Sequence, residues 1–158
     1  MLSPEAILFR RMTQSVFRIN SAVLRQGDLL NAPFGQTSAR WWLLYVISLG
    51  DDSVASIART TGNSRQAVQR LADALVTDQL ASYGPNLTDR RKQAITPTDR
   101  GWEILNEIES SFDDLAKRVV PRFGADELDA AIDQLDAIRS LIDQDIEHIK
   151  ESRKTKHD

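Results

Sequence analysis

Polar side chains able to read DNA bases lie at the start of a segment with helical periodicity, roughly residues 64–78. Arginine presents paired donors that match guanine, and glutamine presents a donor and an acceptor that match adenine in the major groove. The polar side chains are Ser64, Arg65, Gln66, Gln69 and Arg70. The apolar ones, three or four positions apart, are Ala67, Val68, Leu71, Leu75 and Val76. This pattern predicts a helix that packs by one side and enters a major groove by the other, with a plain solvated face as the alternative.

A shorter helix is predicted just before this segment. Ser53 is a typical N-cap residue, and Val54, Ile57 and Ala58 then share one face. Residues 61–63, Thr-Gly-Asn, supply a tight turn between the two helices. Helix, turn and helix in this order form the arrangement that places a recognition helix on DNA.

An extended hairpin is predicted after the second helix. Residues 80–83 and 90–95 form its strands, and Gly, Pro and Asn mark a tip within residues 84–89. Three cations follow the tip: Arg90, Arg91 and Lys92. Such charges are also common as solubilising charges on strand edges. The hairpin completes a winged helix-turn-helix, and Thr96 with Pro97 predicts the cap and first position of the next helix.

Two helices are predicted before this module. The first opens at residues 3–5, Ser-Pro-Glu, carries apolar residues every three or four positions and ends near Gly27. Residues 31–35 then form a loop. The second helix is capped within residues 37–38 and extends to about Leu49. It is apolar on most sides, so we expect it to be buried on more than one face.

Two long helices are predicted after the module. The first begins at Thr98, ends at Pro121 and includes Gly101, which favours close packing at that point. The second begins within residues 124–127 and carries an apolar seam with acidic residues opposite. The apolar seams of the first and last helices of the chain have no obvious cover in a single copy. This predicts a homodimer.

The composition limits the classes of site. The 158-residue chain fits one compact domain and has no cysteine, which excludes disulfides, thiolate metal sites and thiol redox switches and suits a reducing cytoplasm. Its longest apolar run, residues 41–47, is too short to span a membrane. The formal net charge is −3, yet residues 59–92 carry a local +3 and residues 101–158 a local −7. We expect this uneven distribution of charge to turn the basic winged helix-turn-helix towards DNA phosphates.

Three segments, residues 40–44, 63–68 and 89–101, make the chain resemble the MarR (multiple antibiotic resistance regulator) family. The resemblance covers nearly the whole chain and implies a mainly α, winged helix-turn-helix fold with long terminal helices that interlock two subunits. It implies binding to double-stranded DNA, with Arg91 in or near the minor groove and Asp89 holding the wing through an ion pair. Gln79 is a departure, because the family usually has glycine at the end of the recognition helix.

The resemblance also implies an organisation and a function. Residues 1–36 are the N-terminal dimerisation helix and loop, residues 37–100 the winged module, and residues 101–158 the C-terminal dimerisation helices. The expected function is a cytoplasmic, homodimeric transcription regulator on a pseudo-palindromic operator, released by a small aromatic or anionic ligand. No catalysis, cofactor or metal is expected.

An effector pocket is implied where the first, second and fifth helices meet the winged module. Its candidate residues are Phe9, Arg11, Met12, Arg40, Trp41 and Tyr45. The two arginines would supply positive charge for an anionic aromatic guest. A plain hydrophobic core is the alternative interpretation of the aromatic residues.

Other interpretations remain open. The acidic residues of the last helix predict a solvated face, and a zinc site of Asp143, Glu147 and His148 is the weaker alternative. A winged-helix adaptor that binds protein is a rival function, against which the cations of the module argue. The dimerisation part of a small-molecule methyltransferase is another, but it needs a Gly-rich nucleotide-binding loop that this sequence lacks.

Overall fold

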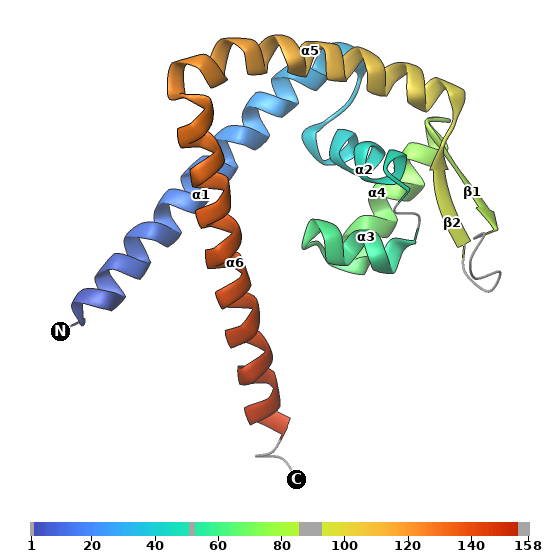
Figure 1. Cartoon of the computed structure of the whole chain (residues 1–158). Helices are drawn as coiled ribbons and strands as arrows, with labels where there is room; N and C mark the ends of the chain where they lie inside the picture. Colours follow the sequence, from blue (N-terminus) through green and yellow to red (C-terminus); the bar gives the residue numbers. More distant parts are fainter. Residues whose placement is uncertain (1, 51–52, 86–92, 155–158) are drawn as a thin grey trace. The chain divides into compact units, whose positions relative to one another are not determined.

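The computed structural model describes residues 2–50, 53–85 and 93–154 and consists of helices with one small sheet (Figure 1). The elements in chain order are α1 (Pro4–Asn31), the 3-10 turn η1 (Ala32–Phe34), α2 (Ser38–Ser48), α3 (Val54–Thr61), α4 (Arg65–Thr77), β1 (Ala81–Pro85), β2 (Gln93–Pro97), α5 (Asp99–Phe123) and α6 (Ala125–Lys154). The chain divides into two compact units, residues 1–112 and 113–158, at a boundary inside α5. Within the described ranges, no helix has the length and hydropathy needed to cross a membrane.

Helix α1 begins where it was predicted to begin but ends later. The Ser3 hydroxyl accepts a hydrogen bond from the Ala6 amide at 3.2 Å and so caps the first turn. The predicted end near Gly27 is wrong, because the helix continues to Asn31. A Cβ atom at Gly27 would collide with the Ser38 hydroxyl. This glycine therefore serves close contact with the start of α2 and does not end the helix.

The start of α2 is tied to the last turns of α1. The Ser38 amide donates a hydrogen bond to Asp28 Oδ1 and the Ser38 hydroxyl donates one to the Leu24 carbonyl, both at 2.8 Å. Residues 31–35, predicted as a loop, contain the single turn η1. The predicted burial of α2 on more than one face is confirmed for Leu43, Leu44, Val46 and Ile47.

The helix-turn-helix forms as predicted. Ser53 caps α3 through the Ser56 amide at 3.2 Å, and Ser64 caps α4 through the Ala67 amide at 3.1 Å. Gly62, in the left-handed region at φ 69°, ends α3 and leads into the turn. Buried side chains of α2, α3 and α4 share one core that includes Leu44, Ile57, Val68 and Leu75. This core fixes the orientation of α4.

The wing is an antiparallel pair of strands. Its register runs from Ala81 opposite Pro97 to Pro85 opposite Gln93. The tip, with the predicted DNA contacts Asp89, Arg90, Arg91 and Lys92, lies outside the described residues.

The predicted cap of α5 is displaced by two residues. Pro97 still belongs to β2, and the cap is Thr98 instead of Thr96. The Thr98 hydroxyl accepts from the Gly101 amide at 3.0 Å and donates to the Gln79 carbonyl at 2.7 Å. Because the strand must pair to its last residue with Ala81, the helix starts only after Pro97. Thr98 thus joins the start of α5 to the turn after α4.

The predicted end of α5 at Pro121 is also wrong. The helix continues through Pro121 to Phe123, and Gly124 follows at φ 104°. A proline removes one N–H donor and disturbs the preceding turn, but here it does not stop the helix. Helix α6 then begins at Ala125, as predicted.

Candidate nucleic-acid interface

The exposed side of α4 carries the predicted base-reading residues. Arg65, Gln66, Gln69 and Arg70 are all exposed, and they lie in the first two turns after the Ser64 cap. Val68, Ala72 and Leu75 on the opposite side are buried. The buried side therefore holds the helix so that its N-terminal polar side chains face outward, as a recognition helix requires.

Gln69 is held by two residues that sequence reasoning missed. Its amide nitrogen donates to Asp73 Oδ1 at 2.9 Å and to the Tyr83 hydroxyl at 2.7 Å, and Tyr83 donates to the same Asp73 oxygen at 2.7 Å. Burial first, and then the Asp73 carboxylate, raise the pKa of Tyr83 to about 12. The i, i+4 spacing of Gln69 and Asp73 was visible in the sequence. The approach of Tyr83 from β1 was not.

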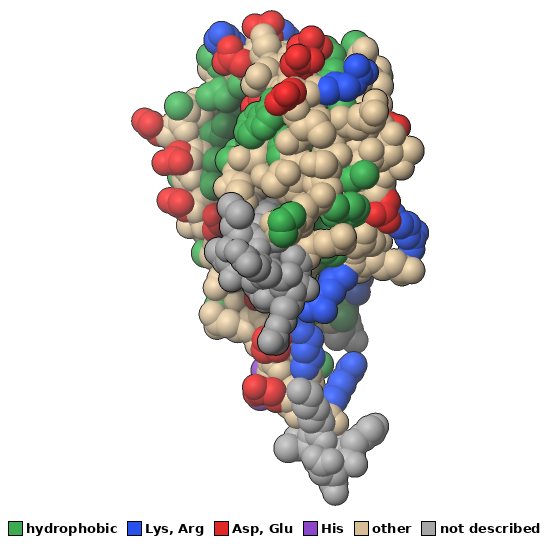
Figure 2. All heavy atoms as spheres, turned by 90° about the vertical axis from the view of Figure 1, so that its right-hand side faces the viewer, with side chains coloured by type: hydrophobic (Ala, Val, Ile, Leu, Met, Phe, Trp, Pro, Cys, Tyr) green, Lys and Arg blue, Asp and Glu red, His purple; other side chains and the backbone are tan. Residues whose placement is uncertain are grey.

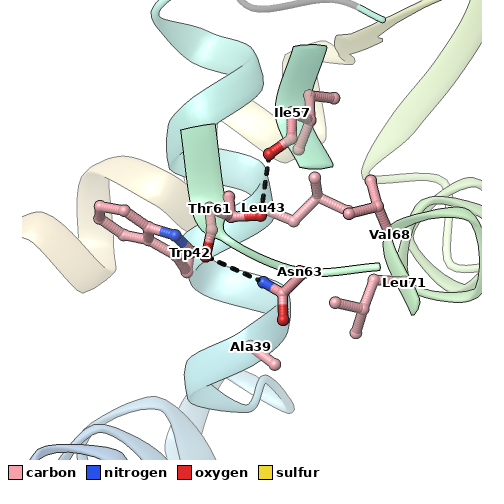
Figure 3. A pocket seen from close by; sticks show the side chains of 8 residues that line it. All are labelled: Ala39, Trp42, Leu43, Ile57, Thr61, Asn63, Val68 and Leu71. Atoms are coloured by element: carbon pink, nitrogen blue, oxygen red, sulfur yellow. Dashed lines mark hydrogen bonds between the residues drawn. The ribbon is translucent and has the colours of Figure 1, made fainter. Parts of the chain in front are cut away.

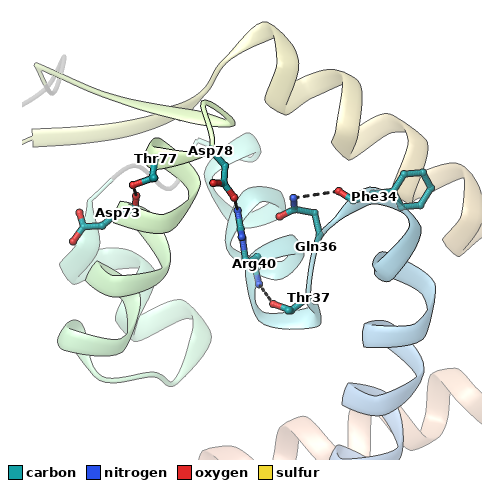
Figure 4. A network of polar contacts seen from close by, with 7 residues as sticks. All are labelled: Phe34, Gln36, Thr37, Arg40, Asp73, Thr77 and Asp78. Atoms are coloured by element: carbon teal, nitrogen blue, oxygen red, sulfur yellow. Dashed lines mark hydrogen bonds and ion pairs between the residues drawn. The ribbon is translucent and has the colours of Figure 1, made fainter.

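Arg40, predicted for the ligand pocket, has a partner within the chain. Its guanidinium forms an ion pair with Asp78 directly after α4, and its side chain is 18% exposed (Figure 4). The pair joins α2 to the end of α4. Close by, the Gln36 side-chain amide donates to the Phe34 carbonyl at 3.3 Å. Arg40 therefore stabilises the position of α4 against α2.

Aromatic side chains of α2 and α5 gather around Trp41. Trp41 lies 5.7 Å from Phe112 of α5 and 6.1 Å from Tyr45, and Trp42 lies 5.5 Å from Tyr45, each measured between ring centroids. The Trp41 indole N–H donates to Glu109 Oε1 at 3.2 Å. The rings thus form a group in which α2 meets α5.

The predicted pocket residues of α1 lie several turns before the contact of this helix with α2. Helix α1 contacts the start of α2 through Leu24 and Asp28. At 1.5 Å per residue, Met12 lies about 18 Å along the helix from Leu24, and Phe9 and Arg11 lie farther still. The ring contacts bring Trp41 and Tyr45 together on α2, whereas the Arg40 guanidinium pairs with Asp78.

A small pocket lies between α2, α3 and α4 (Figure 3). It is lined mainly by apolar side chains, with Thr61 and Asn63 at its polar side and Trp42 at its edge. Its volume is about 60 Å³. An apolar cavity that holds benzene measures about 150 Å³. The pocket in this structure is therefore too small for an aromatic acid.

The acidic residues of α6 face solvent. Arg139 pairs with Asp136 and Asp143, each at 3.3 Å, and Lys150 pairs with Glu147 at 2.5 Å. Over the described part of the chain, no three His, Asp or Glu side chains lie close enough to hold a metal ion. These residues have the arrangement of a solvated helix face.

We next compared the chain with known families and known proteins. No family model matches the chain. Uncharacterized proteins of Mycobacterium tuberculosis and Mycobacterium bovis are 36% identical to it over 98 residues, which is 62% of this chain and 68% of theirs.

Solved structures resemble the fold over most of its length. A MarR/EmrR family transcriptional regulator from Acinetobacter aligns with a TM-score of 0.77 and 22% identity, over 87% of this chain and 98% of its own. A mutant MarR from E. coli in complex with operator DNA aligns with a TM-score of 0.73 and 19% identity, over 81% of this chain and 93% of its own. A Staphylococcus aureus MarR in complex with salicylate and kanamycin aligns with a TM-score of 0.72 and 17% identity, over 86% of this chain and 93% of its own. The chain therefore has the winged helix-turn-helix fold of the MarR-type transcription regulators.

Proposed function

We propose that the protein is a MarR-type transcription regulator that binds double-stranded DNA through α4 and the wing. The observation that carries the proposal is the outward polar face of α4, with Arg65, Gln66, Gln69 and Arg70 exposed above a buried apolar side. Arginine and glutamine at the N-terminal end of such a helix match guanine and adenine edges in the major groove. The structural similarity to a MarR bound to operator DNA supports this proposal.

A homodimer is part of the proposal. Helix α1 exposes large apolar side chains, among them Leu8 at 65% and Phe17 at 69%. Figure 2 shows a different face, on the side of the wing, where hydrophobic side chains also lie among charged ones. Apolar exposure of this extent marks an interaction surface. A twofold dimer would place two recognition helices on half-sites roughly 34 to 36 Å apart, so the operator would be pseudo-palindromic.

Release of the protein from DNA by a small aromatic anion is the last part of the proposed function. The similarity to a MarR bound to salicylate supports this ligand class. Trp41 and Tyr45 supply aromatic surface on α2, and Arg40 would have to leave Asp78 to pair with a ligand carboxylate. Salicylate titrated into the protein–DNA complex should lower DNA affinity and quench tryptophan emission in parallel. Trp102→Phe should preserve the signal, because Trp102 lies about 15 Å along α5 from Phe112, the member of this aromatic group on that helix.

Selection of bound sequences from a random DNA pool tests the DNA-binding function. The parent protein should enrich an inverted repeat, and Arg65→Ala and Arg70→Ala, each made separately, should weaken binding to it. Arg118→Ala removes the same charge from an exposed site on α5 and serves as the control. A parent protein that enriches no sequence would exclude the regulator and favour the protein-binding adaptor.

A further inference from the structure

The hydrogen-bond network of Gln69, Asp73 and Tyr83 connects the reading face of α4 to β1. Gln69 and Asp73 lie one turn apart on α4, and Tyr83 lies in β1, so the network spans two elements. We propose that Asp73 and Tyr83 are positioning residues that turn the Gln69 carboxamide nitrogen towards the wing and leave its oxygen to read an amino group on a DNA base. This inference rests on the proposed function and adds a base preference to it.

The donors and acceptors of the network favour one orientation of Gln69. A carboxylate oxygen is an acceptor, and Asp73 Oδ1 accepts from both Gln69 and Tyr83. Tyr83 donates its single hydroxyl proton to Asp73, so it presents a lone pair to Gln69 across 2.7 Å. A flipped carboxamide would place its oxygen against the Asp73 carboxylate oxygen, and Tyr83 could donate to it only by giving up its hydrogen bond to Asp73.

The protonation of Tyr83 supports this arrangement. Burial and the Asp73 carboxylate raise the pKa of Tyr83 to about 12. The phenol therefore keeps its proton at neutral pH and continues to donate it to Asp73. The network then keeps the same directions of donation under the conditions in which DNA binds.

The fixed orientation has a consequence for base recognition. With the nitrogen turned towards the wing, the atom that Gln69 offers outward is its carboxamide oxygen, an acceptor. In the major groove, adenine N6 and cytosine N4 carry amino groups, whereas guanine O6 and N7 and thymine O4 are acceptors. Gln69 should therefore select adenine or cytosine and reject guanine and thymine at the position it contacts.

The test compares base preferences in sequences selected from a random DNA pool. Gln69→Ala identifies the position by loss of preference there. Asp73→Asn replaces the carboxylate by a group that can donate or accept, so a flipped Gln69 is no longer rejected. It should reduce the preference for adenine or cytosine at that position by about fivefold or more, and leave the other positions unchanged. Tyr83→Phe should reduce it less, because the Asp73 carboxylate remains.

The controls separate orientation from folding and charge. Tyr45→Phe removes a hydroxyl from α2, outside the network, and should keep the parent preference. Asp73→Asn also removes a negative charge, which raises affinity for all sequences alike and so does not alter a ratio between bases. Circular dichroism checks that each variant folds. If Asp73→Asn does not fold, Tyr83→Phe takes its place as the test variant.

Three results would overturn the inference: a parent preference for guanine or thymine at the Gln69 position, no change at any position in Gln69→Ala, or an unchanged preference in Asp73→Asn. In each case a parent that still enriches an inverted repeat leaves the regulator function standing. A parent that enriches no sequence overturns that function and this inference together.

Discussion

Tyr83 makes the stability of the winged module depend on pH. Its pKa is raised to about 12 in the folded chain, against about 10 for an unfolded tyrosine. Below pH 10 both states hold the proton and the stabilisation is complete. As pH rises from 10 towards 12, the unfolded chain loses the proton first, so the free energy of unfolding decreases. Urea unfolding between pH 9 and 11.5 should show this decrease.

The two tyrosines of the chain allow a matched comparison. Tyr83→Phe should flatten the decrease above pH 10, because the titrating group is gone. Tyr45→Phe should keep the parent slope. Equal slopes in all three proteins would refute the role of Tyr83 in this pH dependence.

At the scale of elements, the end of α4 is strained at Gln79. Its φ of 60° lies in the left-handed region, which costs a residue with a Cβ roughly 1 to 2 kcal/mol. Gln79→Gly should therefore increase the free energy of unfolding, by about 1 kcal/mol after the added chain entropy of glycine is subtracted. Gln66→Gly makes the same change inside α4 and should lower the free energy of unfolding by about 0.5 to 1 kcal/mol. Denaturant unfolding measures both, and a loss of stability in Gln79→Gly would contradict the assignment of strain.

The junction of α4, the wing and α5 depends on the absence of a side chain at Gly101. A Cβ there would collide with the Leu80 carbonyl oxygen. Gly101→Ala should therefore lower the free energy of unfolding by about 1 to 3 kcal/mol, as overpacking does. Gly84→Ala is the control, because a Cβ at Gly84 meets nothing within 4 Å. Similar stabilities for the two variants, measured by thermal unfolding, would mean that the backbone around Leu80 moves to make room for the added Cβ at little cost in free energy.

At the scale of the whole molecule, the exposed apolar face of α1 leads to a prediction about assembly. Light scattering at low micromolar concentration should give the mass of a dimer. Phe17→Glu places a charge on this face and should shift the mass towards the monomer. Arg59→Glu introduces the same residue on the exposed side of α3, in the winged module, and should leave the dimer intact. A monomeric parent protein would refute the interlocked dimer and the pairing of half-sites.

The sequence by itself determined most helix starts and the winged module. Ser3, Ser53 and Ser64 cap their helices through an amide three residues ahead, so the signal is local and complete in a few residues. The alternation of buried and exposed positions in α4 follows from helical periodicity in the same way.

Only the tertiary structure decided where α1 ends, where α5 begins and ends, and what the polar side chains bind. Gly27 does not end α1 because it faces Ser38, and Thr98 replaces Thr96 as a cap because Pro97 completes the pairing of β2. Arg40 meets Asp78 across 38 positions of the chain, and Gln69 meets Tyr83 across 14. Such contacts depend on how elements pack against one another. Periodicity and capping within a short segment carry no information about that packing.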